Sequence, residues 1–168
     1  MPNDPNSDSY LIGVLGAGAM GRGIAQVAAA GGMRVRLFDA NPDAVQDAHK
    51  FIGNMFNRAA ERGRMTTDEA AAALSRVEPA DSMQGFADCD TVVEAIIENL
   101  EIKHKVLADL EGIIREDAII ASNTSSLSVT TIASGCKHPS RVAGFYFFNP
   151  VPLMPLVEVI AGVLTEEW

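Results

Sequence analysis

A short apolar run that leads into a glycine-rich turn constrains the fold of this chain more than any other feature. Residues 11–15 read Leu-Ile-Gly-Val-Leu, and Gly16, Gly18 and Gly21 follow in the spacing G-x-G-x-x-G, before alanine-rich sequence that predicts a helix over 23–30. Strand, turn and helix in this order are the fingerprint of a dinucleotide-binding βαβ unit. The first glycine allows a sharp turn, the second lets a pyrophosphate approach the backbone, and the third lets the helix lie close to the strand.

An acidic residue at a suitable distance strengthens this interpretation. Residues 34–38 predict a second strand, and Asp39 follows that strand directly. In dinucleotide-binding units an acid about 20 residues beyond the glycines accepts hydrogen bonds from the adenosine ribose, and we expect Asp39 to do so. A carboxylate there repels a 2′-phosphate, so the pattern favours NAD over NADP. Arg34 and Arg36 are interpreted as charges that flank the strand.

The composition of the whole chain restricts its class and its partners. The chain has 168 residues, of which 48% are hydrophobic and 21% charged, which suits one globular domain with a substantial core. Its net charge of −9 argues against nucleic acid or an anionic membrane as a partner. Residues 1–9 are predicted to be a disordered lead-in, and residues 10–168 to form the domain. Cys89 and Cys136 match no metal or redox spacing, so we expect no metal and interpret them as reduced thiols of a cytoplasmic protein.

Helices and strands alternate along the rest of the chain. Helical periodicity or capping patterns occur at 44–62, 66–74 and 101–114, and apolar strand patterns at 75–79, 90–97, 118–121, 142–148 and 156–160. This order predicts an α/β fold with a doubly wound, mostly parallel sheet and helices on both faces. The apolar face of the helix over 101–114 is predicted to consist of Ile102, Val106, Leu110 and Ile113.

Polar side chains follow several of the predicted strands within a few residues. They are Glu98, Asn123, Ser125 and Asn149. Ligands of doubly wound sheets bind outside the carboxyl ends of the strands. We therefore expect these side chains to gather at the edge where the glycine turn holds the cofactor.

Four motifs occur in the same order as in a known enzyme family. They are Gly16-Ala17-Gly18-Ala19-Met20-Gly21, residues 92–100 with Lys103, residues 122–127, and residues 147–154 with 156–159. Together they resemble the NAD-binding domain of the L-3-hydroxyacyl-CoA dehydrogenases, from about residue 11 to residue 160. The resemblance implies oxidation of the 3-hydroxyl of an acyl-CoA substrate to a ketone with NAD, or the reverse. It also implies a cofactor site made of Gly16, Gly18, Ala19, Met20, Gly21, Asp39, Glu98, Lys103, Asn123 and Asn149.

The same resemblance implies a catalytic group of Ser125, Tyr146 and Glu158, with one departure. In the family a histidine before Phe-Phe-Asn-Pro is the general base, a later glutamate orients it, and a serine contacts the reacting oxygen; here Tyr146 occupies the histidine position. Imidazole titrates near pH 6.5 and tyrosine near 10, so tyrosine is the poorer base, and a neighbouring carboxylate disfavours a tyrosinate further. We expect neither His104 nor His138 to replace the imidazole. The chain is therefore predicted to be weak or inactive in oxidation, whereas a neutral tyrosine can still donate a proton for ketone reduction.

The length of the chain is the second departure. The family continues after the final strand with a helical domain, and we expect that domain to be missing from a chain that ends at Trp168. Residues 151–156 and Trp168 are then predicted to be exposed or to pair with a second copy in a homodimer. Two alternative functions stay open: a non-catalytic NAD-binding module, and a related dehydrogenase of small hydroxy acids.

Overall fold

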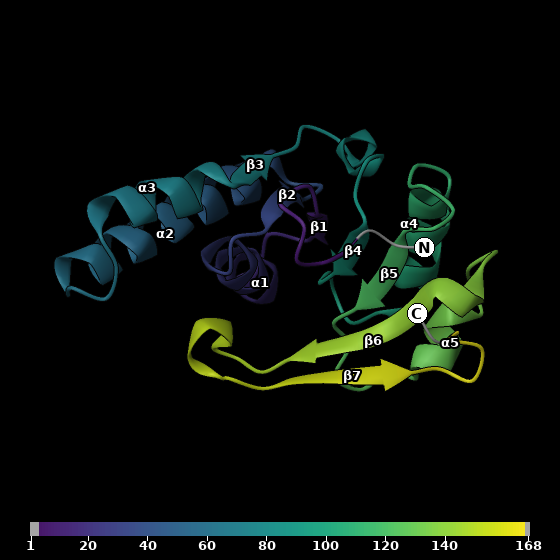
Figure 1. Ribbon diagram of the computed structural model, residues 1–168. Helices are drawn as coiled ribbons and strands as arrows, with labels where there is room; N and C mark the ends of the chain where they lie inside the picture. The colour runs from purple at the N-terminus through teal and green to yellow at the C-terminus, as the bar shows by residue number, and fades with distance from the viewer. Residues whose placement is uncertain (1–3, 167–168) are drawn as a thin grey trace.

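One seven-stranded sheet organises residues 4–166, the part of the chain that the computed structural model describes (Figure 1). The strand order is β3-β2-β1-β4-β5-β6-β7. The strands are β1 (Leu11–Leu15), β2 (Arg34–Phe38), β3 (Val77–Pro79), β4 (Thr91–Glu94), β5 (Ile119–Ser122), β6 (Val142–Phe147) and β7 (Val157–Ala161). Neighbouring strands are parallel except β6 and β7, which are antiparallel. The predicted α/β fold with a doubly wound, mostly parallel sheet is confirmed.

The helices are α1 (Ala19–Ala30), α2 (Pro42–Glu61), α3 (Thr67–Ser75), α4 (Leu100–Glu111) and α5 (Val129–Ala133), with short 3₁₀ turns η1 (Met83–Phe86), η2 (Pro139–Arg141) and η3 (Val151–Leu153). Helices α2 to α5 begin where the sequence supplies a residue whose side chain caps them, whereas α1 begins at the glycine turn. Asn41 caps α2 by accepting a hydrogen bond from the backbone of Asp43. Thr66 and Glu69 form a reciprocal capping box at the start of α3, as predicted.

Two apolar layers cover the two faces of the sheet. Helices α1, α2 and α3 pack on one face, where Ile24, Val45 and Ile52 belong to one buried cluster with strand residues such as Val35 and Leu37. Helices α4 and α5 and the turn η1 pack on the other face in a second cluster. Figure 1 shows the two groups of helices on opposite sides. This arrangement leaves the carboxyl ends of β1, β4 and β5 at one common edge.

Two element boundaries and one additional helix differ from the sequence prediction. Helix α1 begins at Ala19 instead of Gly23, because the helix starts directly after the second glycine of the turn. Strand β4 ends at Glu94 instead of residue 97, because the Glu94 side chain accepts a hydrogen bond from the Ile96 amide and turns the chain. Helix α5 was not predicted, although Ser128 caps it and was a readable signal.

The buried face of α4 is also different from the predicted one. Its buried residues are Lys103, Leu107 and Leu110, whereas Ile102 is 42% exposed. The prediction is confirmed for Leu110, and Val106 is partly buried, but it was wrong for Ile102, because it placed only apolar residues in the core. Because Lys103 is buried in this layer, the buried stripe of the helix is shifted by about one residue. The contacts of the buried lysine are described with the site below.

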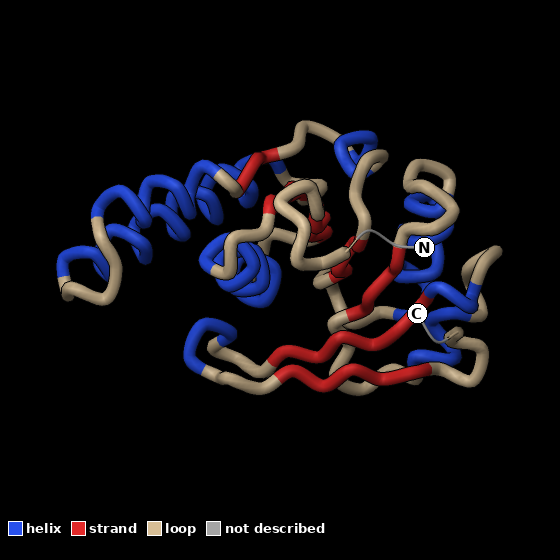
Figure 2. Tube along the Cα trace, in the orientation of Figure 1, coloured by secondary structure: helices blue, strands red, loops and turns tan. Residues whose placement is uncertain are grey.

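The antiparallel pair β6 and β7 forms one edge of the sheet, and a loop with η3 joins the two strands (Figure 2). All residues of β7 are exposed. Leu153, Met154 and Leu156 in the loop are exposed as predicted, but Val151 is buried. Val151 packs against Gly23 of α1, where an added Cβ would lie 2.9 Å from the Val151 side chain. Trp168 lies outside the described residues.

The start of the chain and the cysteines complete the fold. Residues 4–9 form hydrogen-bonded turns before β1, and the disordered lead-in over 1–9 stays a prediction. Within residues 4–166, no helix is both long enough and apolar enough to cross a membrane. Cys89 and Cys136 are free thiols, as predicted, and burial raises the pKa of each to about 12. Neither is therefore a thiolate at neutral pH.

Candidate active site

The glycines of the turn have two different physical roles. Gly16 has a φ of +109°, and an added Cβ would lie 2.5 Å from the carbonyl oxygen of Ala95. An added Cβ on Gly21 would lie 1.7 Å from the Gly16 carbonyl oxygen, so the fold itself requires both glycines. Gly18 differs, because no atom of the described residues lies within 4 Å of its would-be Cβ. Its bare surface is the place where a ligand can approach the backbone.

The N-terminus of α1 fits an anion at this surface. Gly18 is the N-cap residue, no side chain of the described residues caps the helix, and its first turn contains no acidic residue. The first amide groups of α1, at Ala19 and Met20, are left without helical partners and lie at the positive end of the helix dipole. The predicted turn therefore suits the pyrophosphate of a dinucleotide.

Asp39 ties the glycine turn to the start of α2. Its Oδ2 accepts a hydrogen bond from the Ala17 amide at 2.8 Å, and its Oδ1 accepts one from the Asn41 amide at 2.9 Å. The sequence prediction assigned Asp39 only to ribose and missed this structural role. A carboxylate offers about four acceptor sites, so two remain for ribose hydroxyls.

A cavity of about 260 Å³ lies at the carboxyl edge of the sheet beside the glycine turn. Its lining consists of Met20, Ala95, Ile96, Glu98, Asn123, Ser125, Tyr146, Phe147 and Asn149. The expectation that the polar residues after the strands gather at one edge is therefore confirmed. They come from the ends of β4, β5 and β6. The cavity combines carboxylate, amide, hydroxyl and phenol groups with an apolar wall, which is typical of a site that orients a small reacting group.

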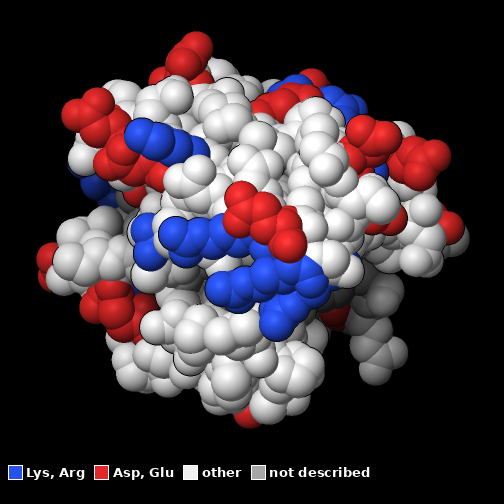
Figure 3. Space-filling view, turned by 90° about the vertical axis from the view of Figure 1, so that its left-hand side faces the viewer, with Lys and Arg blue, Asp and Glu red and all other residues white. Residues whose placement is uncertain are grey.

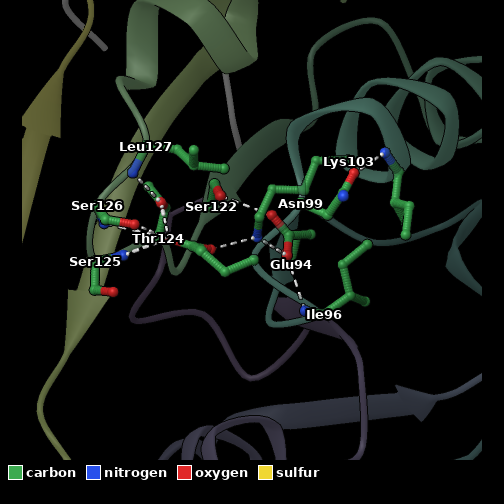
Figure 4. A network of polar contacts seen from close by, with 11 residues as sticks. Glu94, Ile96, Asn99, Lys103, Ser122, Thr124, Ser125, Ser126 and Leu127 are labelled. Atoms are coloured by element: carbon green, nitrogen blue, oxygen red, sulfur yellow. Dashed lines mark hydrogen bonds and ion pairs between the residues drawn. The ribbon is translucent and has the colours of Figure 1, made fainter.

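Hydrogen bonds connect the loops that line this cavity. The Asn123 side chain accepts a hydrogen bond from the Phe147 amide at 2.9 Å, which joins the end of β5 to β6. The amides of Ser125 and Ser126 donate to Glu98 Oε1 at 3.0 and 3.2 Å, and the Thr124 hydroxyl donates to the same oxygen (Figure 4). The loop that carries Ser125 is thus gathered around one carboxylate oxygen.

The environment of Glu98 keeps it ionised. Burial alone raises the pKa of this carboxyl, but the hydrogen bond from Thr124 and the charge of Lys103 outweigh burial and lower the pKa to about 2. Its second oxygen lies 3.2 Å from Lys103 Nζ. Glu98 therefore remains a carboxylate throughout the physiological range.

Lys103 does not line the cavity. Its side chain is 0% exposed, and its Nζ lies 2.6 Å from Oε1 of Glu94, which is also 0% exposed. The predicted cofactor contact of Lys103 stays a prediction, and the contacts in the structure are with two carboxylates. The sequence prediction missed Glu94, although an acid within the apolar strand pattern over 90–97 was a readable signal.

Tyr146 and Glu158 form a direct cross-strand pair in the β6–β7 ladder. Directly opposed residues in such a ladder present their side chains on the same face, with Cβ atoms about 5 Å apart. The Tyr146 ring packs edge-on against Phe148, with centroids 4.7 Å apart, and lines the cavity. The register therefore places the predicted carboxylate beside the predicted catalytic position.

The cavity wall contains no histidine or lysine. His104 Nε2, on α4, is in hydrogen-bond contact with the Thr131 carbonyl of α5 at 2.7 Å. His138 precedes η2, at the end of β6 opposite to Tyr146. Neither imidazole lines the cavity, and His138 lies at the start of β6, as predicted. That neither replaces the base stays a prediction. Within residues 4–166, no group of His, Cys, Asp or Glu side chains is arranged to hold a metal ion.

Comparison with known proteins assigns this geometry to a family. Residues 11–168 match the family model described as "3-hydroxyacyl-CoA dehydrogenase, NAD binding domain". The fatty acid oxidation complex subunit alpha of Pseudomonas paraeruginosa is 43% identical over 160 residues, which is 95% of this chain and 22% of the relative. The chain thus spans about a fifth of the length of the curated relatives that it matches.

Solved structures of related enzymes have the same fold. The (S)-3-hydroxybutyryl-CoA dehydrogenase of Ralstonia eutropha superposes with a TM-score of 0.91 at 39% identity, covering 94% of this chain and 56% of that chain. The 3-hydroxybutyryl-CoA dehydrogenase of Escherichia coli gives a TM-score of 0.91 at 39% identity, covering 94% of this chain and 33% of that chain. Both proteins are longer than the chain described here.

Proposed function

Since the chain belongs to the NAD-binding domain family of the 3-hydroxyacyl-CoA dehydrogenases, we propose that it holds NAD for hydride transfer to and from C3 of a 3-hydroxyacyl-CoA. The cofactor of this family is NAD, which accepts the hydride from C3 when bound. We assign the adenosine and pyrophosphate to the glycine turn, Asp39 and the start of α1. We assign the reacting end to the cavity at the ends of β4, β5 and β6.

The chemistry of the cavity is proposed to run better as reduction than as oxidation. Oxidation needs a base to accept the hydroxyl proton, and Tyr146 has only the Glu158 carboxylate opposite it in the ladder. Lys103, the cation that would favour a tyrosinate, is held by Glu94 and Glu98. A neutral Tyr146 hydroxyl can donate its proton to the carbonyl oxygen, while the Ser125 hydroxyl hydrogen-bonds the same oxygen.

One observation carries this proposal. A single cavity beside the bare Gly18 surface is lined by Ser125 from the loop after β5, Tyr146 from strand β6 and Asn149 from the loop after β6. The need for a stable core does not explain why these polar residues meet at the switch point of the sheet. Folds of this kind bind their ligands there.

The test follows NADH absorbance in both directions with the same protein. Both rates are divided by those of a relative that has the histidine. The ratio for reduction of acetoacetyl-CoA with NADH is expected to be higher than the ratio for oxidation of 3-hydroxybutyryl-CoA with NAD. The variant Tyr146→His is expected to raise the oxidation rate by up to the ~10²–10⁴-fold that a general base contributes. Tyr146→Phe is the matched control and should remove residual reduction without changing NAD affinity. If Tyr146→His binds NAD normally and gains no rate, the assignment of Tyr146 is wrong.

A non-catalytic NAD-binding module is the second candidate. The absence of histidine and lysine from the cavity wall favours it. NAD binding without turnover in either direction, in both the original chain and Tyr146→His, would select this function. Turnover of small hydroxy acids in the same assay would select a different substrate class.

The acyl-CoA substrate is proposed from the family and from the surface charge. Lys and Arg side chains gather around a hollow on the face drawn in Figure 3, on the side that carries the turn between α2 and α3. Helix α2 has Arg58 in its last turn and Arg62 as its C-cap, and Arg64 and Arg76 line a cavity of about 470 Å³ at the amino ends of β2 and β3. Clustered cations on a chain of net charge −9 are suited to the phosphates of a CoA.

We further propose a cytoplasmic protein in which the exposed apolar segment of η3 and β7 pairs with a second copy. Leu153 is 72% and Val159 69% exposed, and β7 is the last strand at one edge of the sheet. Such edges and patches favour association. Light scattering over a concentration series tests this, and a monomer at every concentration would contradict it. The free thiols support the cytoplasmic assignment.

A further inference from the structure

A second cavity, of about 170 Å³, lies between α1, α2 and the η3 loop, which runs beside α1 (Figure 1). Asn149 lines both this α1–α2 cavity and the reacting cavity at the ends of β4, β5 and β6, so the two cavities are adjacent. Phe51 and Met55 form its wall on α2, and Arg58 follows Met55 by one turn of the same helix. The α1–α2 cavity therefore lies between the reacting end of the site and the cations at the end of α2.

Gln26 of α1 brings an unsatisfied polar group to the wall of the α1–α2 cavity. The residue is 9% exposed, and its buried side-chain oxygen has no hydrogen-bond partner among residues 4–166. A buried acceptor without a partner destabilises the folded chain, and a leucine of similar volume would avoid that cost. The carboxamide can turn about its terminal bond, which has only a weak torsional preference, and so present the oxygen to a ligand in the cavity.

Arg22 lies one turn before Gln26 on the same face of α1, and it lines the same cavity. Its guanidinium packs 3.9 Å from the centroid of the Phe51 ring, and no carboxylate in the described part of the chain forms an ion pair with it. Side chains four residues apart on a helix are neighbours, with Cβ atoms about 5–6 Å apart. The two residues therefore offer a hydrogen-bond acceptor and a group of donors side by side.

A secondary amide within an apolar chain is the ligand group that matches this pair. Its N–H needs an acceptor and its C=O needs a donor, and Gln26 and Arg22 supply one of each. A phosphate needs donors only and would leave the Gln26 oxygen unpaired, and an alkyl chain would satisfy neither residue. Phe51, Met55 and Leu153 provide apolar surface for methylene groups on either side of the amide.

We propose that the α1–α2 cavity holds the pantetheine arm of the thioester substrate, and that Gln26 and Arg22 are specificity-determining residues that bind one amide of this arm. The inference rests on the proposed function, because in an acyl-CoA the arm joins the thioester to the phosphates and contains secondary amides separated by methylene groups. The arm then runs from the reacting cavity past Gln26 toward Arg58. A small free hydroxy acid has no amide, so this pair selects against it.

The experiment titrates CoA into the chain by calorimetry, with saturating NAD present to keep CoA away from the glycine turn. Adenosine 3′,5′-bisphosphate, which has phosphates but no arm, is titrated in parallel. The variant Gln26→Leu removes the acceptor at similar volume, and Arg22→Met removes the donors but keeps an apolar stem. Gln46→Leu is the matched control, because Gln46 is an exposed residue of α2 that does not line the cavity.

CoA affinity is expected to fall about 3- to 10-fold in Gln26→Leu, as for one lost hydrogen bond, and at least as much in Arg22→Met. Affinity for the bisphosphate should change by less than about twofold in Gln26→Leu, and Gln46→Leu should retain both affinities. Gln26→Leu should also be no less stable in urea than the unmodified chain, because the oxygen that it removes has no partner there.

Unchanged CoA affinity in Gln26→Leu, or an equal loss of affinity for the bisphosphate, would overturn the inference. A loss of stability in Gln26→Leu would assign the oxygen a structural partner and would overturn it as well. If the unmodified chain binds NAD but not CoA, the acyl-CoA substrate of the proposed function is wrong, and the inference is wrong with it.

Discussion

Gly18 offers the sharpest test of the glycine turn, because the structure separates its role from that of its neighbours. The substitution Gly18→Ala adds a methyl group where no atom of the described residues lies within 4 Å. The residue has φ −67° and ψ −169°, a conformation that alanine adopts readily. The change therefore tests the ligand surface without disturbing the fold.

The expected effect of Gly18→Ala on stability is small. Alanine restricts the unfolded chain and contributes about 0.4–1 kcal/mol where the backbone permits it. Alanine is also a poorer N-cap than glycine, by a similar amount. The two effects offset each other, so the free energy of unfolding should change by less than about 1 kcal/mol.

The expected effect on NAD affinity is larger. A methyl group at this point keeps the pyrophosphate away from the amides of Ala19 and Met20. One lost charge-assisted hydrogen bond costs about 1.5–3 kcal/mol, which is about 10- to 100-fold in affinity. ADP-ribose should weaken by the same factor, because it carries the same pyrophosphate.

Gly21→Ala is the matched comparison in the same turn. Its methyl group would lie 1.7 Å from the Gly16 carbonyl oxygen, so backbone atoms must move by more than about 1 Å. This overpacking should cost about 2–3 kcal/mol of stability or more. Urea unfolding and calorimetric titration of NAD on both variants measure the contrast. A Gly18→Ala protein that is stable and binds NAD as tightly as the original would refute the placement of the pyrophosphate.

Three further predictions follow from contacts in the structure. Asp39→Asn should weaken NAD binding about tenfold without creating NADP preference, because the Ala17 amide loses its carboxylate partner; a variant that binds NADP more tightly than NAD in a titration would contradict this. Thr66→Ala should lower the free energy of urea unfolding by about 1 kcal/mol through loss of the capping box, with NAD affinity unchanged. The pKa of Glu98 is lowered to about 2 by its contacts, whereas an unfolded glutamate titrates near 4.3, so its stabilising contribution is present above that value and lost as the pH falls toward 2. The stability difference between the original chain and Glu98→Gln should therefore be constant near neutral pH and shrink in acid, and a difference independent of pH would exclude these contacts as its source.

The sequence predicted the sheet and its ligand edge because both depend on local patterns. The glycine spacing, the capping residues at Asn41 and Thr66, and the apolar strand runs act within a few residues of the chain. The alternation of helices and strands then determines which strand ends meet. The positions of polar residues directly after strands therefore suffice to assign them to one edge of the sheet.

The contacts across the sheet could not be predicted in the same way. Asp39 binds Ala17, 22 residues earlier, and Asn123 binds the Phe147 amide, 24 residues later. Each pairing depends on how loops from different strands pack, which no local pattern encodes. The burial of Val151 against Gly23 has the same cause, since a glycine in α1 makes room for a distant loop residue.

The sequence prediction fails most clearly at the buried ion pair of Lys103 and Glu94, where two charges are removed from water. Apolar periodicity assigned α4 a face that included Ile102, yet the helix turns Lys103 inward to meet Glu94 and leaves Ile102 42% exposed. A sequence selected only for stability would bury the isoleucine and solvate the lysine. Natural proteins break local rules mainly where function requires it. The exposed isoleucine and the buried lysine are therefore two consequences of one contact, the ion pair that Lys103 forms with Glu94 inside the helix layer.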